Sequence, residues 1–346
     1  MKMSSCPRDD ILLGHFFNCI MASTTIDEPL LQDVENRYTL FPIQHQDVWD
    51  IYTKMKALMW HAEEINLERD LEDWPKMTED ERHFIKYVLA FFAGADGIVL
   101  ENLGTRFMNE ISIPEVRCVY GFQLMMENIH SHTYSLLIDT LIKNPQEKEF
   151  LFNGMTTIPV IGKKDQWALK WIDSDASFPT RLLAFLVVEG IFFSGSFCAL
   201  FWLKGRNLMP GLCFSNELIS KDENLHAEFA VLLYSKIVNK LDESVVHAIF
   251  KEAVDIEKEF INEAIPCRLI GMNAESMATY IEFVADYWLK QLGYSALFNA
   301  SNPFSFMVNQ SLSTLQKTDF FAHKVSNYNM ASIVMGNVDY NTISDF

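Results

Sequence analysis

The spacing Glu-x-x-His occurs twice in this chain of 346 residues and nowhere else. Glu127 and His130 form the first copy, and Glu223 and His226 form the second. On a helix, residues i and i+3 lie about 60° apart around the axis and one turn along it, so each pair can direct a carboxylate and an imidazole at one point. One copy alone is a weak signal in an acid-rich chain. Two copies indicate two helices that supply the same pair of metal ligands.

A lone acidic residue precedes each pair inside an apolar stretch. Asp96 is the only charged residue in 87–100, 31 positions before the first pair, and Glu189 is the only one in 182–203, 34 positions before the second. A buried carboxylate without a cation costs several kcal/mol, and neither stretch contains Lys or Arg. Four-helix di-metal carboxylate sites take one acid from each of two helices and Glu-x-x-His from the other two. The repeated order therefore favours metal as the cation.

Four carboxylates and two imidazoles suit iron or manganese better than zinc, which prefers His and Cys in structural sites. The sequence thus predicts two redox-active ions that share bridging carboxylates. The predicted ligands are Asp96, Glu127, His130, Glu189, Glu223 and His226.

Almost the whole of 46–292 follows a helical pattern, and no alternating strand pattern competes with it, so the predicted fold class is all-α. Thr78 with Glu81 predicts a capping box that opens a helix reaching about residue 109. Ser112 with Glu115, followed by the first-turn Pro114, predicts another box at the start of the next helix. Further helices are expected over 146–172, from 179 to about 205, and over 215–239, 243–265 and 274–292.

Composition restricts the partners and the compartment. A net charge of −18 disfavours nucleic acid and anionic membranes as partners. Six cysteines without a Cys-x-x-Cys motif indicate free thiols in a reducing, cytoplasmic compartment. The stretch 182–203 is long enough to span a bilayer, but its glutamate, glycines and serines favour a core helix. Met21 is the expected physiological start, because residues 11–20 would expose Ile, Leu and Phe with nothing to pack on.

An aromatic group is expected beside the metal. Tyr134 lies four residues after His130, on the same helical stripe as the first pair of ligands. Phe193 and Phe197 continue the stripe of the second lone acid, and Ile219 lies one turn before the second Glu-x-x-His pair. A tyrosine at such a position is ordinarily a core residue. Here its phenol would be walled by apolar side chains beside an oxidising metal pair. His132, by contrast, faces away from the stripe and is not counted as a ligand.

Several segments resemble the small, radical-generating subunit of class I ribonucleotide reductase, of the eukaryotic type. The resemblance runs from about residue 38 to the terminal Asp345-Phe346. The segments are LAFFAGADGIVLENL (89–103), RCVYGFQLMMENIHSHTYSLLIDT (117–140), VEGIFFSGSF (188–197), MPGLCFSNELISKDENLH (209–226) and LIGMNAESMATYIEFVAD (269–286).

The resemblance implies a ferritin-like, mostly helical bundle with additional helices that forms a homodimer. Residues 1–37 would be a flexible N-terminal extension, 38–313 the ferritin-like helical domain, and 314–346 a flexible C-terminal tail that docks on the large subunit. The large subunit would reduce ribonucleoside diphosphates in its own site, and this chain would not bind the nucleotide substrate.

The resemblance also implies a role for each site residue. One of two iron ions would be held by Asp96, Glu127 and His130, and the other by Glu189, Glu223 and His226, with Glu127 and Glu223 bridging. Oxygen would react at the diferrous pair and leave a stable radical on Tyr134. Phe193, Phe197 and Ile219 match the family's radical pocket, Trp60 and Asp222 its electron and proton relay, and Tyr328 the tail tyrosine that passes the radical on.

The sequence departs from the family's pattern in the tail, and two other functions fit part of it. In the tail, Thr342 occupies a position where a leucine is expected, which bears on docking and not on the chemistry. A different di-iron oxygenase, such as a desaturase or hydroxylase, would need an open substrate cavity at the metal. A non-catalytic paralogue should have lost ligands, and an iron-storage shell has no use for the aromatic relay.

Overall fold

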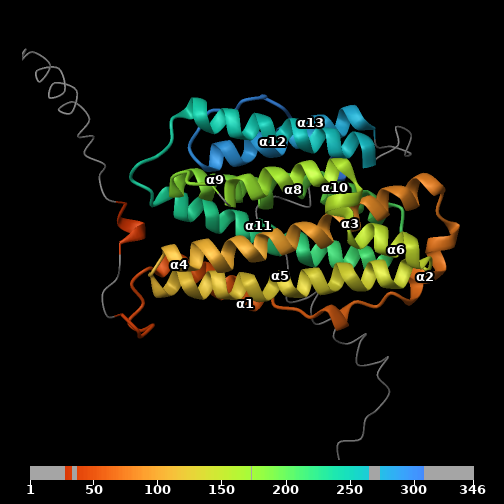
Figure 1. The fold of residues 1–346 in the computed structure, drawn as a ribbon, viewed down its shortest axis with the longest axis horizontal. Helices are drawn as coiled ribbons and strands as arrows, with labels where there is room; N and C mark the ends of the chain where they lie inside the picture. The colour runs from red at the N-terminus through yellow and green to blue at the C-terminus, as the bar shows by residue number, and fades with distance from the viewer. Residues whose placement is uncertain (1–27, 33–36, 173, 265–272, 308–346) are drawn as a thin grey trace, which may run out of the picture.

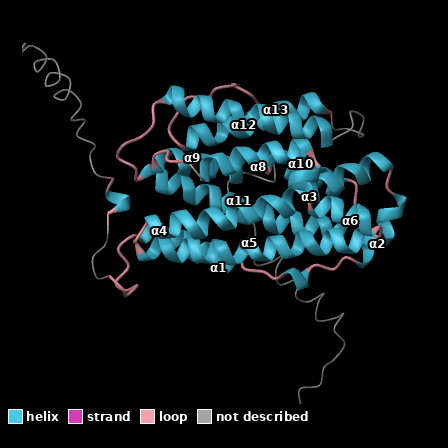
Figure 2. Ribbon diagram, viewed as in Figure 1, coloured by secondary structure: helices cyan, strands magenta, loops and turns pink. Residues whose placement is uncertain are grey.

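A computed structural model describes residues 28–32, 37–172, 174–264 and 273–307 of the chain. All regular structure in this part of the chain is helical, which confirms the all-α prediction (Figure 2). The α-helices are α1 (Gln46–Ala57), α2 (Glu68–Asp73), α3 (Glu79–Asn102), α4 (Met108–Glu110), α5 (Pro114–Leu141), α6 (Pro145–Phe152), α7 (Gly154–Thr157), α8 (Pro159–Ile172), α9 (Phe178–Val187), α10 (Ser194–Gly205), α11 (Pro210–Ser235), α12 (Glu243–Ala264) and α13 (Ala274–Gln291). Two π-helical segments, η4 (Leu103–Phe107) and η5 (Val188–Phe192), and short 3₁₀ turns connect some of them.

The long helices lie side by side along the longest axis of the molecule (Figure 1). On one side α3 packs against α5, and α5 against α1; on the other side α12 packs against α13. Between them lie α11 and the α9–η5–α10 segment. The helices α3, α5, α11 and this segment surround the centre of the bundle, so all the predicted metal ligands lie on core helices.

Both predicted helix starts are confirmed, but only one of the two is closed by a capping box. The hydroxyl of Thr78 accepts a hydrogen bond from the Glu81 N–H at 3.2 Å, and the Glu81 carboxylate accepts one from the Thr78 N–H at 2.8 Å, so this capping box is present. The box predicted for Ser112 and Glu115 does not form: α5 begins at Pro114 without a side-chain cap.

A tertiary contact takes the place of that second box. The carboxylate of Glu115 forms an ion pair with Arg37 at 2.6 Å and accepts a hydrogen bond from the Gln44 N–H at 2.7 Å. The Ser112 hydroxyl donates instead to the carbonyl of Gln32 at 3.2 Å. A charge-assisted bond to Arg is stronger than a bond from Glu to its own helix start. These contacts tie the segment before α1 to the bundle.

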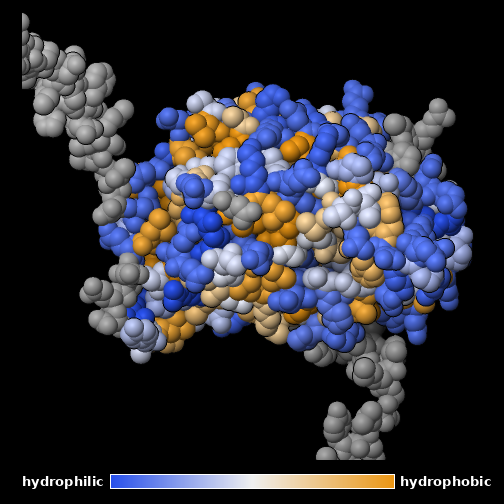
Figure 3. All heavy atoms as spheres, in the orientation of Figure 1, coloured by the Kyte–Doolittle hydropathy of each residue, from blue (hydrophilic) through white to orange (hydrophobic). Residues whose placement is uncertain are grey.

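The predicted helix from 179 to about 205 is also interrupted. α9 passes into the π-helix η5, which contains Glu189, and α10 starts only after Phe193. The whole segment Phe178–Gly205 is apolar and long enough to cross a membrane, yet its most apolar part is completely buried in the bundle. It is therefore a core element, as predicted. On the molecular face in Figure 3, hydrophilic side chains surround scattered apolar patches.

Part of the predicted N-terminal extension packs on the bundle. Leu30 is buried, and the Glu28 carboxylate accepts hydrogen bonds from the backbone of Val238 and Asn239. The predicted domain boundary at residue 37 stays a prediction. The predicted tail, 314–346, lies outside the described residues.

Candidate metal centre

Two groups of buried acidic and imidazole side chains meet at the centre of the bundle. Within each group, the candidate ligand atoms lie within 4.8 Å of one another, and every member is buried. Glu127 belongs to both groups. One group is Asp96, Glu127 and His130, and the other is Glu127, Glu189, Glu223 and His226. The structure thus brings together all six predicted ligands, which we call the metal centre.

The two Glu-x-x-His pairs interlock across α5 and α11. Nδ1 of His130 lies 3.2 Å from Glu127 Oε2 and 2.9 Å from Glu223 Oε1. Nδ1 of His226 lies 3.0 Å from Glu127 Oε1 and 3.0 Å from Glu223 Oε2. Each glutamate therefore contacts both imidazoles, which is the arrangement expected of two carboxylates that lie between two ion positions.

The charges of the centre fit cations. Burial raises the pKa of Asp96 and Glu189 well above the usual carboxyl range. Burial acts in the opposite direction on His226, but Glu223 and Glu127 raise the pKa of that imidazole to about 9. Asp96 Oδ2 and Glu189 Oε2 are buried without a hydrogen-bond partner. Such oxygens are expensive to bury, and cations at this point would satisfy them. The donor set therefore fits a pair of metal ions.

Gln123 belongs to the surroundings of the centre, although it was not predicted. Its Nε2 donates to Glu189 Oε1 at 3.0 Å and lies 3.5 Å from Glu127 Oε1. It is fully buried on α5, one turn before Glu127. Its position four residues before Glu127 was the available sequence signal, but glutamine is uncharged and does not belong to a pattern of charged ligands.

A polar connection leads from the centre towards the N-terminal part of the chain. The carboxylate oxygen Asp222 Oδ2 accepts a hydrogen bond from Trp60 Nε1 at 2.8 Å and lies 3.1 Å from His130 Nε2. The Trp60 ring also lies nearly parallel to the His130 imidazole, with 5.8 Å between the ring centroids. All three side chains are buried. The predicted relay residues therefore form a continuous chain of contacts to a predicted ligand.

Tyr134 lies in an aromatic environment beside the centre. Its ring stacks on Phe92, with 4.6 Å between the centroids, and Phe92 contacts both Phe193 and Phe197. Burial raises the pKa of the Tyr134 phenol well above its usual value, and the charges of the neighbouring carboxylates, Asp96 first, raise it further. The phenol is thus protonated and kept from solvent.

The other predicted site residues are placed as follows. Ile219 is fully buried on α11. Phe92, which forms the wall next to Tyr134, was missed, although it precedes Asp96 by one helical turn. His132 is exposed, in agreement with its exclusion. Tyr328 lies outside the described residues.

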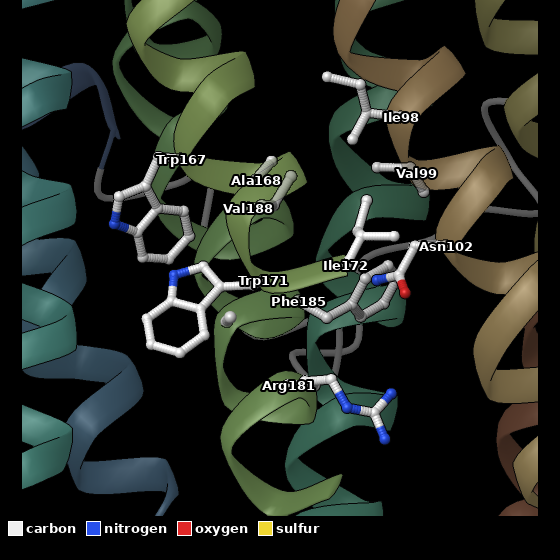
Figure 4. A pocket seen from close by; sticks show the side chains of 11 residues that line it. Ile98, Val99, Asn102, Trp167, Ala168, Trp171, Ile172, Arg181, Phe185 and Val188 are labelled. Atoms are coloured by element: carbon white, nitrogen blue, oxygen red, sulfur yellow. The ribbon is translucent and has the colours of Figure 1, made fainter. Parts of the chain in front are cut away.

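A pocket on the α3, α8 and α9 helices does not open onto the metal centre. It is lined by apolar side chains, by Trp167 and Trp171, and at one end by Arg181 (Figure 4). None of the six ligands lines it. An oxygenase that acts on an organic substrate would need such a cavity at the metal, so this pocket does not support that alternative.

Comparison with known proteins identifies the family. The family described as "Ribonucleotide reductase, small chain" matches residues 37–303. The sequence is 56% identical over 317 residues to the ribonucleoside-diphosphate reductase small chain of Trypanosoma brucei brucei, a match that covers 91% of this chain and 94% of that protein. It is 56% identical over 315 residues to the ribonucleoside-diphosphate reductase small subunit of Dictyostelium discoideum, covering 90% of this chain and 93% of that protein.

A solved structure agrees with the sequence relatives. The ribonucleotide reductase Rnr4 homodimer from Saccharomyces cerevisiae is similar with a TM-score of 0.75 and 36% identity, covering 88% of this chain and 93% of that chain. The similarity supports the predicted ferritin-like helical bundle, and the buried carboxylate and imidazole cluster is of the di-metal kind. On the sequence match across most of its length, the protein belongs to the small-chain family of ribonucleotide reductases.

Proposed function

We propose that this chain is the radical-generating subunit of a ribonucleoside-diphosphate reductase, an oxidoreductase that is active only with its large subunit. The observation that carries the proposal is the single buried centre in which the six ligands, the aromatic wall of Tyr134 and the Trp60–Asp222 connection meet. The names of the relatives support the same activity.

The proposed cofactor is a pair of iron ions in each chain, with manganese as the alternative metal. We assign one ion to Asp96, Glu127 and His130 and the other to Glu189, Glu223 and His226. The shared membership of Glu127 and the contacts of both glutamates with both imidazoles support Glu127 and Glu223 as bridging ligands. When bound, a redox-active pair supplies the oxidising power of dioxygen to a neighbouring phenol.

The side chains around the centre determine which residue carries the radical and how long the radical lasts. Tyr134 gives up one electron and its hydroxyl proton and becomes a neutral radical. Phe92, Phe193 and Phe197 keep water and reductants from the ring, since all three are buried and form one aromatic cluster. The low-polarity wall thereby lengthens the life of the radical.

The proposed route out of the centre uses Asp222 and Trp60. Trp60 donates an electron to the Tyr134 radical, which takes back a proton and returns to the phenol, while the hydrogen bond of Trp60 to Asp222 gives the indole proton an acceptor at 2.8 Å. From there we propose transfer through Tyr328 in the tail to the large subunit, which holds the nucleotide. We further propose docking through 314–346, a homodimer of this chain, and a reducing cytoplasmic location, consistent with the free thiols of Cys118, Cys198 and Cys213.

Reconstitution tests the proposal directly. The metal-free chain is loaded with Fe(II), exposed to oxygen, and assayed for bound iron and for an EPR signal. We expect two iron ions per chain and a tyrosyl spectrum that is absent from Tyr134→Phe. A protein that binds two ions but gives no tyrosyl signal with either iron or manganese would contradict the radical-generating role.

A further inference from the structure

The segment that carries Glu189 ends in an irregular turn whose backbone carbonyls are bonded by side chains. Trp288 Nε1 donates to the Gly190 carbonyl at 3.1 Å, and the Ser194 hydroxyl donates to the Ile191 carbonyl at 2.7 Å. A π-helix displaces the regular hydrogen-bond ladder, and buried carbonyls left without it need other donors. The next carbonyl, that of Phe192, is bonded by a charged side chain.

Lys164 provides that charged donor from α8. Its Nζ donates to the Phe192 carbonyl at 2.6 Å, and the lysine is 1% exposed. The same Nζ forms an ion pair with Glu257 of α12 at 2.7 Å and lies 3.2 Å from the centroid of the Phe91 ring. A fully buried lysine is rare, and this one donates from α8 to a backbone carbonyl of another element, η5.

Glu257 lies on the other side of the same turn. Its carboxylate packs against the backbone of Gly195, where a Cβ atom would lie only 2.7 Å from Oε1. Burial raises the pKa of Glu257 to about 7, against the opposing effects of Lys164 and of the Gly195 backbone amide. The ion pair thus spans the turn: the Lys164 ammonium group contacts the carbonyl of Phe192, and the Glu257 carboxylate contacts the backbone of Gly195.

This turn lies between two parts of the metal centre. Glu189 precedes Phe192 by three residues within η5, and Phe193, which follows it, contacts the Phe92 ring that stacks on Tyr134. A buried ion pair adds little net stability, because desolvation offsets its attraction. The pair does, however, contact the backbone on both sides of the point where the chain leaves the π-helix.

We propose that Lys164 and Glu257 are positioning residues of the metal centre, which hold the turn after η5 and so set the places of the Glu189 carboxylate and the Phe193 ring. This inference rests on the proposed function, in which Glu189 is a ligand and Phe193 shields the radical. Neither Lys164 nor Glu257 touches the six ligands in any contact described above.

The test replaces the pair by apolar side chains of similar length, in Lys164→Met/Glu257→Met. Removing both charges together avoids an unpaired buried charge, so the metal-free variant should melt within a few degrees of the wild type. The control is Lys163→Met/Glu259→Met, which removes an exposed ion pair between the same two helices. Three readouts are compared: melting of the metal-free protein, Co(II) affinity with its visible spectrum, and the decay rate of the tyrosyl EPR signal after loading with Fe(II) and oxygen.

We expect Co(II) affinity to fall about 10- to 100-fold in the buried double variant, as for other groups that orient metal ligands, with an altered Co(II) spectrum and a shorter-lived radical. The control should match the wild type in all three readouts. A stable double variant with wild-type affinity, spectrum and radical decay overturns the inference.

Two further arms keep the test decisive. If the double variant does not fold, Lys164→Met takes its place, because it removes the donor to the Phe192 carbonyl, while Glu257, whose pKa burial raises to about 7, can take up a proton and become neutral; unchanged Co(II) affinity there also overturns the inference. A wild-type protein that binds neither Co(II) nor Fe(II) would instead refute the proposed function, which separates the two failures.

Discussion

Trp60 and Asp222 are separated by 162 positions in the chain, and yet the indole Nε1 donates to the carboxylate Oδ2 at 2.8 Å in the interior. The same oxygen lies 3.1 Å from Nε2 of His130. Asp222 thus connects Trp60, which lies outside the ligand helices, to His130. The other ring nitrogen of His130, Nδ1, faces the metal centre. An electron that passes through Trp60 has a proton acceptor fixed in place.

The relay is tested by Trp60→Phe, which keeps an aromatic ring but removes the N–H donor. We expect two bound metal ions and a normal Tyr134 signal, with ribonucleotide reduction by the mixed enzyme reduced to background, because the electron route is cut. The half-buried Trp49 on α1 supplies the control, and Trp49→Phe should retain turnover. Normal turnover in Trp60→Phe would remove this residue from the route.

The radical position is tested by a matched pair of tyrosines on α5. Tyr134→Phe should keep the metal and lose the tyrosyl EPR signal, since the ring volume is retained. Tyr120 is equally buried, stacks on Phe107, and has a hydroxyl without a hydrogen-bond partner. Tyr120→Phe should therefore keep the signal and be neutral or slightly stabilising. A tyrosyl spectrum that disappears in Tyr120→Phe and persists in Tyr134→Phe would reverse the assignment.

The bridging role is tested by comparing Glu127→Ala with Asp96→Ala. Glu127 belongs to both ligand groups and Asp96 to one, so the first change should cost both ions and the second mainly one. Iron content after reconstitution, measured per chain, distinguishes them. Two tightly bound ions in Glu127→Ala would show that this carboxylate does not bridge.

The contribution of Asp165 to stability should fall as the pH rises towards 7. Burial raises the pKa of this carboxyl from 3.8 to about 7. A group whose pKa is higher in the folded than in the unfolded state contributes stability below its unfolded pKa and loses it as the pH rises through the folded value. Asp165→Asn should therefore gain stability over the wild type between about pH 4 and pH 7, by a few kcal/mol at most, at about 1.4 kcal/mol per pKa unit.

Urea unfolding at pH 4, 5.5 and 8 measures this difference. The exposed Asp255 serves as a control for a lost negative charge in Asp255→Asn. A difference between Asp165→Asn and the wild type that is the same at all three pH values would refute the assignment.

The tail gives a further prediction outside the described residues. Deleting the last seven residues should abolish activity of the mixed enzyme while leaving metal content and the Tyr134 radical unchanged. Tyr328→Phe should keep binding to the large subunit, measured by a pull-down, but stop turnover, because phenylalanine is not oxidised at an accessible potential. Normal reduction in Tyr328→Phe would make Tyr340 the next candidate.

The sequence predicted best what depends on local spacing. The two Glu-x-x-His pairs and Tyr134 stand at helical intervals, the lone acids are single charges in apolar stretches, and the Thr78 capping box is complete within four residues. The box at Ser112 failed because Arg37, far away in the chain, binds Glu115. A local pattern carries no information about such a distant partner.

Irregular backbone was harder to predict. The run 182–203 is apolar on every side, so nothing in its periodicity marks the π-helix at Glu189. The signal lay in other segments, at Lys164 and Trp288, whose donors bond the displaced carbonyls. Phe92 and Gln123 were missed for a related reason: each is an ordinary core or polar residue in its own helix. Another helix brings Tyr134 beside Phe92 and Glu189 beside Gln123.

The sharing of Glu127 between both ligand groups means that the two ion positions are not independent. The first ion to bind would take up charge on a carboxylate that the second ion also needs, so the affinity of each position would depend on whether the other position is filled. Because ions bind only the folded bundle, the free energy of loading also adds to the stability of the fold. Cellular metal supply would then set two quantities together: how many chains are active, and how many remain folded.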